Sequence, residues 1–481
     1  MSNRPGFLPQ PAPSLAVGGA ILILAYTATI RVLQRYFGFQ SLHNFWQPLV
    51  LLGLFLLGWG WINLRAEKPA WLPRANRVLL PVGVFLLAYA AFHHLSCWLG
   101  WFDTLPQTYW DQLAVSFLKG KLYLENPTYF HDLTKFQSRW YVPNPPLPAL
   151  VLMPFVLLSG PEINVVRISV FFAALNTLLV FAILEQAARL GWIALERGGR
   201  LWITALFAFG TPHVYNAING QMWFFSRTLA VTFIALGSLA ALRRWPAWTA
   251  GLCLGAAVCS RPDVAVLWPF FLAVYAQRVW DQPARSRLWP PRAALRPLVS
   301  AGLQTALPVL LAAGGLLLYN YLRFGDWLDF GYLTLNGAEQ IVRDAQTYGM
   351  FNPHFIPRNL YFMFLAYPEA RPQAPYLFPS RDGMSMLLTT PAFFFLFRRQ
   401  SMNVWKAGAL AAVLINLALL ALYHNTGSFQ FGYAYLLDFI VPLLLLLAAG
   451  LGQKTPRLFA ALCALSILIN LLGAFWFNAN F

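Results

Sequence analysis

Residues 164–186, NVVRISVFFAALNTLLVFAILEQ, carry one charged residue near each end, Arg167 and Glu185, and are otherwise mostly apolar. A helix of this length crosses the roughly 30 Å hydrocarbon core of a bilayer. Similar runs recur along the chain and make about 13 candidate transmembrane helices. The candidates lie at 15–33, 47–64, 79–100, 164–186, 201–218, 223–242, 246–259, 264–280, 298–322, 386–398, 404–423, 432–450 and 457–478. The sequence therefore predicts an all-α, polytopic integral membrane protein.

The composition excludes a soluble protein. Of the 481 residues, 58% are hydrophobic and only 11% are charged, against roughly 25% charged residues in an ordinary soluble domain. The net charge of +17 does not indicate a nucleic-acid partner, because the basic residues are dispersed over many short loops and do not gather on one face. All four cysteines lie inside apolar runs, which favours small core residues over a disulfide framework.

The distribution of charge predicts the topology. Residues Pro145 to Gly160 are apolar but short and rich in proline, so we expect this segment to dip into the membrane without crossing it. Most of the 34 basic residues then fall on one side with only four acids, Glu67, Glu185, Glu196 and Asp281. The positive-inside rule makes that side cytoplasmic and places the N-terminus there.

Two predicted outer segments are too long to be simple connections. They are residues 101–163, the first long loop, and residues 323–385, the second long loop. The run Tyr109 to Leu124 has the spacing of an amphipathic helix lying in the membrane surface, and Leu360 to Tyr367 is a second candidate. We find no repeat and no soluble domain, so residues 1–481 are predicted to form a single integral membrane domain.

Carboxylates in the first long loop are candidate catalytic residues. Asp103 directly follows a span, Asp111 lies on the predicted surface helix, and Asp132 follows His131 ahead of a proline-rich stretch. A carboxylate held at the end of a rigid span is suited to act as a general base. The alternative is that each acid is merely a solvated group of an outer loop, and this alternative applies most strongly to Asp111.

Two further acids lie at membrane depth. Asp438 lies roughly two turns inside a span, where a charged group costs several kcal/mol unless it is paired or faces water. Asp263 follows Arg261-Pro262 between two short spans. Both acids indicate a polar cavity that opens outward. Each acid also has a simpler interpretation that is equally open. Asp438 could make a hydrogen bond that packs two helices together, and Asp263 could merely neighbour Arg261 at the start of a helix.

Arginines at membrane depth supply the complementary charge. Arg261, Arg323 and Arg358 are predicted to bind a phosphate or diphosphate, because a guanidinium group always stays charged and grips phosphate with two hydrogen bonds. His131 and Asp438 complete the predicted donor site, although each arginine alone also fits an interfacial anchor. The sequence has no HExxH, Walker or GxGxxG pattern, so no cofactor or metal is indicated, while a divalent ion stays open.

Several short motifs in a fixed order resemble the GT-C superfamily of membrane glycosyltransferases. They are PPLPAL at 145–150, LFAFGTPH at 206–213, YNYLRFG at 319–325 and YHNTG at 423–427. Protein O-mannosyltransferases and the bacterial aminoarabinose transferase are the most similar groups. The resemblance implies an essential carboxylate at the start of the first long loop, which is Asp103. Thr104 follows it where the mannosyltransferases often have a second acid, so Asp111 or Asp132 would supply that group.

The resemblance also implies a function. We expect an inverting glycosyltransferase of the bacterial cytoplasmic (inner) membrane, with its active site on the outer face. The donor would be a sugar linked to polyprenyl phosphate, and the acceptor a lipid, a glycan or a protein. The alternative is a lipid or glycan transporter without transferase chemistry, in which the charges at membrane depth line a translocation path.

Overall fold

A computed structural model of the chain describes residues 19, 42–64, 71–100, 108–279, 292–373 and 376–480. The chain forms two compact units, residues 1–103 and 104–481. In the first unit, α2 (Leu42–Leu64) packs against α3 (Leu72–Trp98). Asn63 and Asn76 exchange hydrogen bonds of 3.3 and 2.9 Å between these apolar helices, and such polar pairs hold membrane helices together. The single domain expected over residues 1–481 stays a prediction.

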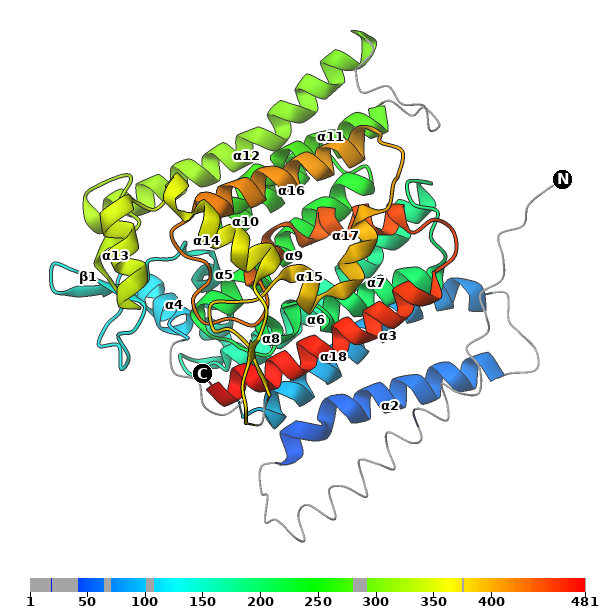
Figure 1. Ribbon diagram of the computed structural model, residues 1–481, viewed down its shortest axis with the longest axis horizontal. Helices are drawn as coiled ribbons and strands as arrows, with labels where there is room; N and C mark the ends of the chain where they lie inside the picture. The colour runs from blue at the N-terminus through cyan, green and yellow to red at the C-terminus, as the bar shows by residue number, and fades with distance from the viewer. Residues whose placement is uncertain are drawn as a thin grey trace. The chain divides into compact units, whose positions relative to one another are not determined.

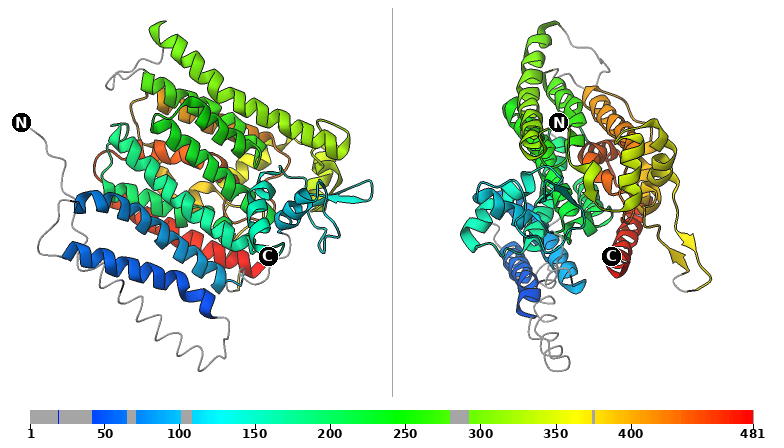
Figure 2. Two further views of the ribbon diagram at one scale, coloured as in Figure 1. Left: turned by 180° about the vertical axis from the view of Figure 1, so that it is seen from behind. Right: turned by 90° about the vertical axis from the view of Figure 1, so that its left-hand side faces the viewer.

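The second unit is a bundle of helices with two small sheets (Figures 1 and 2). Its α-helices are α4 (Trp110–Leu118), α5 (Leu147–Ser159), α6 (Val165–Arg189), α7 (Arg197–Phe209), α8 (His213–Ala217), α9 (Met222–Leu242), α10 (Ala247–Val258), α11 (Trp268–Val279), α12 (Arg292–Phe324), α13 (Glu339–Tyr348), α14 (Ile356–Leu360), α15 (Met386–Thr389), α16 (Val404–Leu422), α17 (Ile440–Gly450) and α18 (Arg457–Asn480). Its strands are β1 (Leu133–Phe136), β2 (Arg139–Tyr141), β3 (Leu335–Asn336), β4 (Glu369–Ala370) and β5 (Leu377–Phe378). Short 3₁₀ turns lie at Pro262–Leu267, Tyr332–Thr334, Pro353–Phe355, Pro391–Phe397 and Ala434–Phe439, and a π turn lies at Tyr361–Leu365.

The expected mostly helical membrane protein is confirmed at this level. Six helices in the described residues are long and apolar enough to cross a bilayer: Leu72–Trp98, Val165–Arg189, Met222–Leu242, Leu295–Phe324, Val404–Leu422 and Arg457–Ala479. Four apolar helices are shorter, namely Gln47–Asn63, Leu147–Ser159, Ala247–Val258 and Ala434–Gly450. The count of about 13 spans stays a prediction, and the candidate at 15–33 lies outside the described residues apart from Gly19. The shallow insertion expected for 145–160, which forms the short α5, also stays a prediction.

Helix α9 is the centre of the second unit, whereas α12 lies at its edge. In the most apolar window of α9, 89% of the residues are buried, against 17% in α12. Helix α10 packs between them, and two of its glycines face α12. A methyl group at Gly251 would lie 2.7 Å from the carbonyl oxygen of Thr305, and one at Gly255 would lie 2.9 Å from that of Pro308. These glycines therefore let α10 and α12 approach to backbone contact.

A three-stranded sheet joins the two long loops, and the sequence analysis did not predict it. Its strand order is β2-β1-β3, all antiparallel. Helix α4 ends at Leu118, and Gly120, two residues later, adopts a φ of +71° that a helix cannot continue through. The helix that was expected to reach Leu124 is therefore only nine residues long. The sheet lies with α4 and α13 at one end of the helices (Figures 1 and 2). Residues from both long loops thereby meet at a single place.

Candidate functional site

A cavity of about 480 Å³ lies in the second unit beside this sheet. Its walls are the residues before β1, the start of α9, the turn after α10, the second long loop, and the segment from the end of α16 to Tyr435. Most lining residues are aromatic or aliphatic. The charged ones are Asp132, Arg227, Arg261 and Asp263. An apolar cavity with a few convergent polar groups is the usual form of a small-molecule site.

The sheet places Asp132 at this cavity. Asp132 directly precedes β1, and its backbone N–H donates a 2.7 Å hydrogen bond to the carbonyl oxygen of Asn336 in β3. Its φ is +61°, in the left-handed region that aspartate tolerates better than most residues. The backbone of Asp132 is therefore fixed by both long loops.

The carboxylate of Asp132 is held by a tryptophan. Trp223 Nε1 in the first turn of α9 donates a 2.8 Å hydrogen bond to Oδ2, and His131 Nε2 lies 3.7 Å from Oδ1. The side chain is 20% exposed. Burial raises the pKa of Asp132 above its usual range, while a charged His131 and the bond from Trp223 act in the opposite direction. This group is oriented, partly desolvated and able to accept a proton.

Arg227 is the most unusual side chain of the cavity. It lies one helical turn after Trp223 on α9 and is only 5% exposed. Its guanidinium carbon lies 4.7 Å from the ring centre of Tyr435. Among the described residues it has neither a hydrogen-bond acceptor nor an ion-pair partner, and its Nε is buried without one. A buried unpaired cation costs free energy, so this site is suited to an anionic ligand.

Arg261 is compensated within the protein. Its Nε and Nη2 donate to the two carboxylate oxygens of Asp438 at 3.2 and 2.8 Å, and Nη2 lies 3.5 Å from Oδ1 of Asp263. Its guanidinium carbon lies 5.1 Å from the ring centre of Tyr435. The aromatic ring therefore has contacts with both cavity arginines. Asp438 is 1% exposed and does not line the cavity itself; it holds Arg261 there.

Arg323 fastens the first long loop to α12. It is 4% exposed, and its two terminal nitrogens donate to the carbonyl oxygen of Val142 at 2.7 Å and to Oδ1 of Asn320 at 2.8 Å. Its guanidinium carbon stacks on the ring of Tyr319 at 3.9 Å. Arg323 is not among the residues that line the cavity, so the structure gives it a structural partner where the sequence suggested a phosphate.

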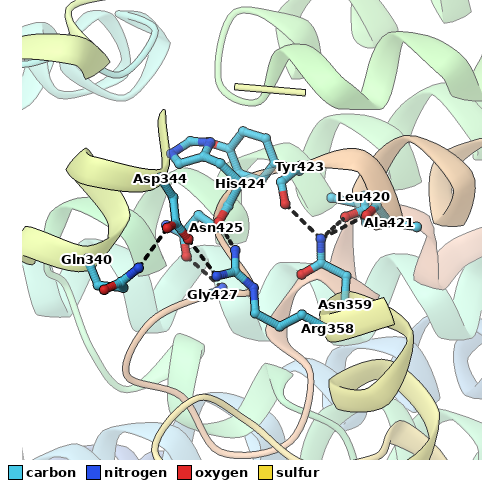
Figure 3. Close-up of polar contacts among 10 residues, drawn as sticks. All are labelled: Gln340, Asp344, Arg358, Asn359, Leu420, Ala421, Tyr423, His424, Asn425 and Gly427. Carbon is cyan, nitrogen blue, oxygen red and sulfur yellow. Dashed lines mark hydrogen bonds and ion pairs between the residues drawn. The ribbon is translucent and has the colours of Figure 1, made fainter. Parts of the chain in front are cut away.

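Arg358 makes a comparable set of contacts in the second long loop (Figure 3). Nη1 pairs with Oδ2 of Asp344 at 2.5 Å, and Nη2 donates to the carbonyl oxygen of His424. Arg358 does not line the cavity, whereas His424 does. Burial lowers the pKa of His424 to about 4, so this histidine is neutral at physiological pH.

The remaining predicted carboxylates lie elsewhere. Asp111 is in the first turn of α4, where it accepts a 2.8 Å hydrogen bond from the hydroxyl of Thr108. Burial raises the pKa of Asp111, and the bond from Thr108 opposes this shift. Asp111 is not a lining residue. Asp103 lies outside the described residues, so its predicted role stays a prediction.

Trp223 and Tyr435 were not predicted as site residues, and Arg227, one of the basic residues at membrane depth on the predicted outer side, was left out of the predicted donor site. A signal for Arg227 was present, because it is the only charged residue in the 21 residues of α9, and a lone charge inside an apolar span marks a functional site. No comparable signal marked Trp223 among the 19 tryptophans of the chain. Its role depends on the non-local sheet that brings Asp132 to it.

Within the described ranges, no three His, Cys, Asp or Glu side chains come together as a possible metal site. His131 and Asp132 are the nearest approach at the cavity, and they supply two donors. A structural zinc or catalytic zinc site needs at least three protein ligands.

Comparison of the chain with protein-family models, curated proteins and solved structures gives no significant match.

Proposed function

We propose that this chain is a GT-C-type glycosyltransferase that moves a sugar from a polyprenyl-phosphate donor to an acceptor hydroxyl. The order of the sequence motifs supports the reaction class, and the cavity supports a site for it. In this proposal the protein spans a bacterial inner membrane, the N-terminus is cytoplasmic, and the cavity opens to the outer face. A lipid-linked donor fits that face, because nucleotide sugars are not available there.

One observation carries the proposal: an oriented carboxylate and an unpaired cation lie in one cavity and are tied to the same helix face. Trp223 and Arg227 are four residues apart on α9, a spacing that places their Cβ atoms about 5–6 Å from each other. Trp223 holds Asp132, and Arg227 has no hydrogen-bond acceptor among the described residues. A displacement at an anomeric carbon needs a base for the acceptor and a cation for the leaving phosphate in the same cavity.

The proposed chemistry is a single in-line displacement. The acceptor oxygen forms a bond to the anomeric carbon, the bond from that carbon to the phosphate oxygen breaks, and the configuration is inverted. Asp132 takes the proton of the acceptor hydroxyl. The polyprenyl phosphate leaves with its added negative charge beside Arg227 and Arg261. Asp103 stays the alternative base that the family resemblance implies.

The test is direct assay of the purified protein in lipid nanodiscs. A panel of polyprenyl-phosphate sugars is supplied with lipid, glycan and peptide acceptors, and released polyprenyl phosphate is measured together with the anomeric configuration of the product. We expect release with inversion for at least one donor. The proposal is wrong if no donor in the panel is turned over while the protein stays folded.

A transporter remains the second candidate, because charges inside an apolar bundle also line translocation paths. The two functions differ in a measurable way. A transporter moves a fluorescent lipid-linked sugar across a proteoliposome membrane without breaking the bond between sugar and phosphate, whereas a transferase breaks that bond without moving the lipid.

A further inference from the structure

We propose that Arg358 and Asn359 are positioning residues. They hold in place two walls of the cavity that are far apart in the sequence, α13 and the segment Tyr423–Phe429. The two residues are neighbours on the five-residue helix α14 (Figure 3). Neither lines the cavity. The inference concerns the shape of the cavity and holds for either of the two candidate functions.

The first wall is α13, which Arg358 fastens through Asp344. Asp344 is 7% exposed, and it accepts hydrogen bonds from Gln340 Nε2 at 2.7 Å and from Arg358 Nη1. Ile341 lies one residue after Gln340 and lines the cavity. Helix α13 otherwise packs mainly against the short turn Tyr332–Thr334. The ion pair to Arg358 is its charged tether to the rest of the unit, beside a 2.9 Å hydrogen bond from Gln346 Nε2 to the carbonyl oxygen of Leu333.

The second wall begins where α16 ends. The last carbonyl groups of a helix have no partner within the helix. Asn359 Nδ2 donates to three of them, those of Leu420, Ala421 and Tyr423, at 3.1, 2.9 and 2.7 Å. Arg358 Nη2 donates to the next carbonyl, that of His424.

Tyr423, His424 and Asn425 all line the cavity. The two side chains thus help to fix where this wall leaves α16, beside the backbone hydrogen bonds that join it to Met350 and Asn352. The arrangement also explains why an arginine at membrane depth need not bind a ligand. The guanidinium of Arg358 bridges one wall to the other, and loss of its charge removes both contacts.

Replacement by lysine leaves a single ammonium group, which we expect to keep the ion pair with Asp344 and to leave the carbonyl of His424 without its donor. Asp344→Asn removes the charge that tethers α13 and leaves the contacts of Asn359 in place. Asn359→Leu removes the donor to the end of α16 without placing a carboxylate against its carbonyl oxygens.

The test uses thiol reporters on each wall of the full-length protein, in a background whose four native cysteines are replaced by alanine. Ile341→Cys reports on α13, and Ser428→Cys reports on the second wall. Rates of modification by a water-soluble maleimide are measured for each reporter. We expect Arg358→Gln to accelerate both by about tenfold, the factor for loss of one hydrogen bond to a charged group. Asp344→Asn should accelerate only Ile341→Cys, and Asn359→Leu only Ser428→Cys.

Two controls separate positioning from general loosening. Arg343→Gln removes an exposed ion pair with Glu339 on the same helix α13, and it should leave both rates unchanged. A third protein retains only Cys463, which is fully buried in α18, and its rate should not change in any variant. Arg358→Lys should restore the slow rate at Ile341→Cys alone. Unchanged rates in Arg358→Gln, or equal acceleration at Cys463, would overturn the proposal.

Discussion

Two groups of buried charges lie in the second unit, one at the C-terminal end of α6 and one at the cavity, and they are partnered differently. Near its C-terminal end, Glu185 accepts hydrogen bonds from Arg197 at 3.2 and 3.3 Å and from Arg200 at 2.7 Å. Arg227, on the neighbouring helix α9, has no hydrogen bond or ion pair in the part of the chain that the structure describes, although the carboxylate of Asp438 attracts it at longer range. The two groups therefore differ in direct contacts and not in an excess of positive charge: both arginines at Glu185 contact that acid, whereas in the cavity only Arg261 contacts Asp263 and Asp438.

The difference separates a structural role from a binding role. Breaking a satisfied buried pair destabilises a protein, because an uncompensated charge is left behind. Removing a cation that has no partner relieves such a penalty. Residues that are kept at a cost in stability commonly serve function. The comparison therefore predicts opposite effects on stability and activity for substitutions at the two clusters.

The largest effect is expected at the carboxylate of the cavity. Asp132→Asn keeps the size of the side chain and can still accept the bond from Trp223, but it removes the basicity. We expect transfer to fall about 10²–10⁴-fold, with donor affinity largely retained. Transfer rate and melting temperature are measured together. A well-folded Asp132→Asn protein with near-normal transfer would move the role of base to Asp103, where Asp103→Asn is the matched variant.

The next effect is expected at the unpaired cation. Arg227→Gln removes the charge beside the leaving phosphate, and we expect transfer to fall about 10²–10³-fold. The same variant should melt at a temperature equal to or above that of the wild type, because a desolvated charge is lost. Arg227→Lys restores the charge and should recover part of the rate. A large drop in melting temperature with full specific activity would reverse the comparison.

At the Glu185 cluster we expect a loss of stability without a loss of transfer rate. Glu185→Gln leaves Arg197 and Arg200 facing a neutral amide, and we expect a loss of about 3 kcal/mol in the free energy of unfolding. Thermal melting in detergent measures the shift. Transfer per folded molecule should stay within about twofold of the wild type at a temperature where both proteins are folded. Selective loss of transfer would show that this cluster also belongs to the site.

The smallest effect sharpens the role of Asp132. Trp223→Phe keeps an aromatic ring and removes the hydrogen bond to Oδ2. That bond lowers the pKa of the carboxyl against the effect of burial, so its loss raises the pKa further. A base must be deprotonated, and the acid limb of the kcat/KM profile should therefore move to higher pH by about half to one unit. An unshifted limb would indicate that another group titrates.

The sequence predicted the helices far better than the site. Long apolar runs make helices wherever the backbone must satisfy its own hydrogen bonds in lipid, so α6, α9 and α16 are evident from composition alone. The three strands of the sheet that positions Asp132 are two to four residues long. They are too short to show an alternation of apolar and polar residues. The pairing of β1 with β3 joins segments about 200 residues apart in the chain, which local patterns do not encode.

The arginines show the same limit. All three arginines were predicted to lie at membrane depth and to bind a phosphate. Arg261 lines the cavity, whereas Arg323 and Arg358 donate to carbonyl oxygens of the protein. Whether an arginine faces a ligand or a loop is decided by which backbone groups lack partners in the folded chain. That information exists only after packing.

The pairing of β1 with β3 has a consequence for biosynthesis. Leu133 lies opposite Asn336, so the sheet cannot close until about 200 further residues have been made, which takes roughly 10–40 s at 5–20 residues per second. During that interval α5 to α12 are synthesised while β1 has no partner on one edge, and an unpaired edge favours wrong associations. A chain stopped before residue 335 would therefore contain most of the helical bundle, whereas the residues of the cavity would still be unassembled.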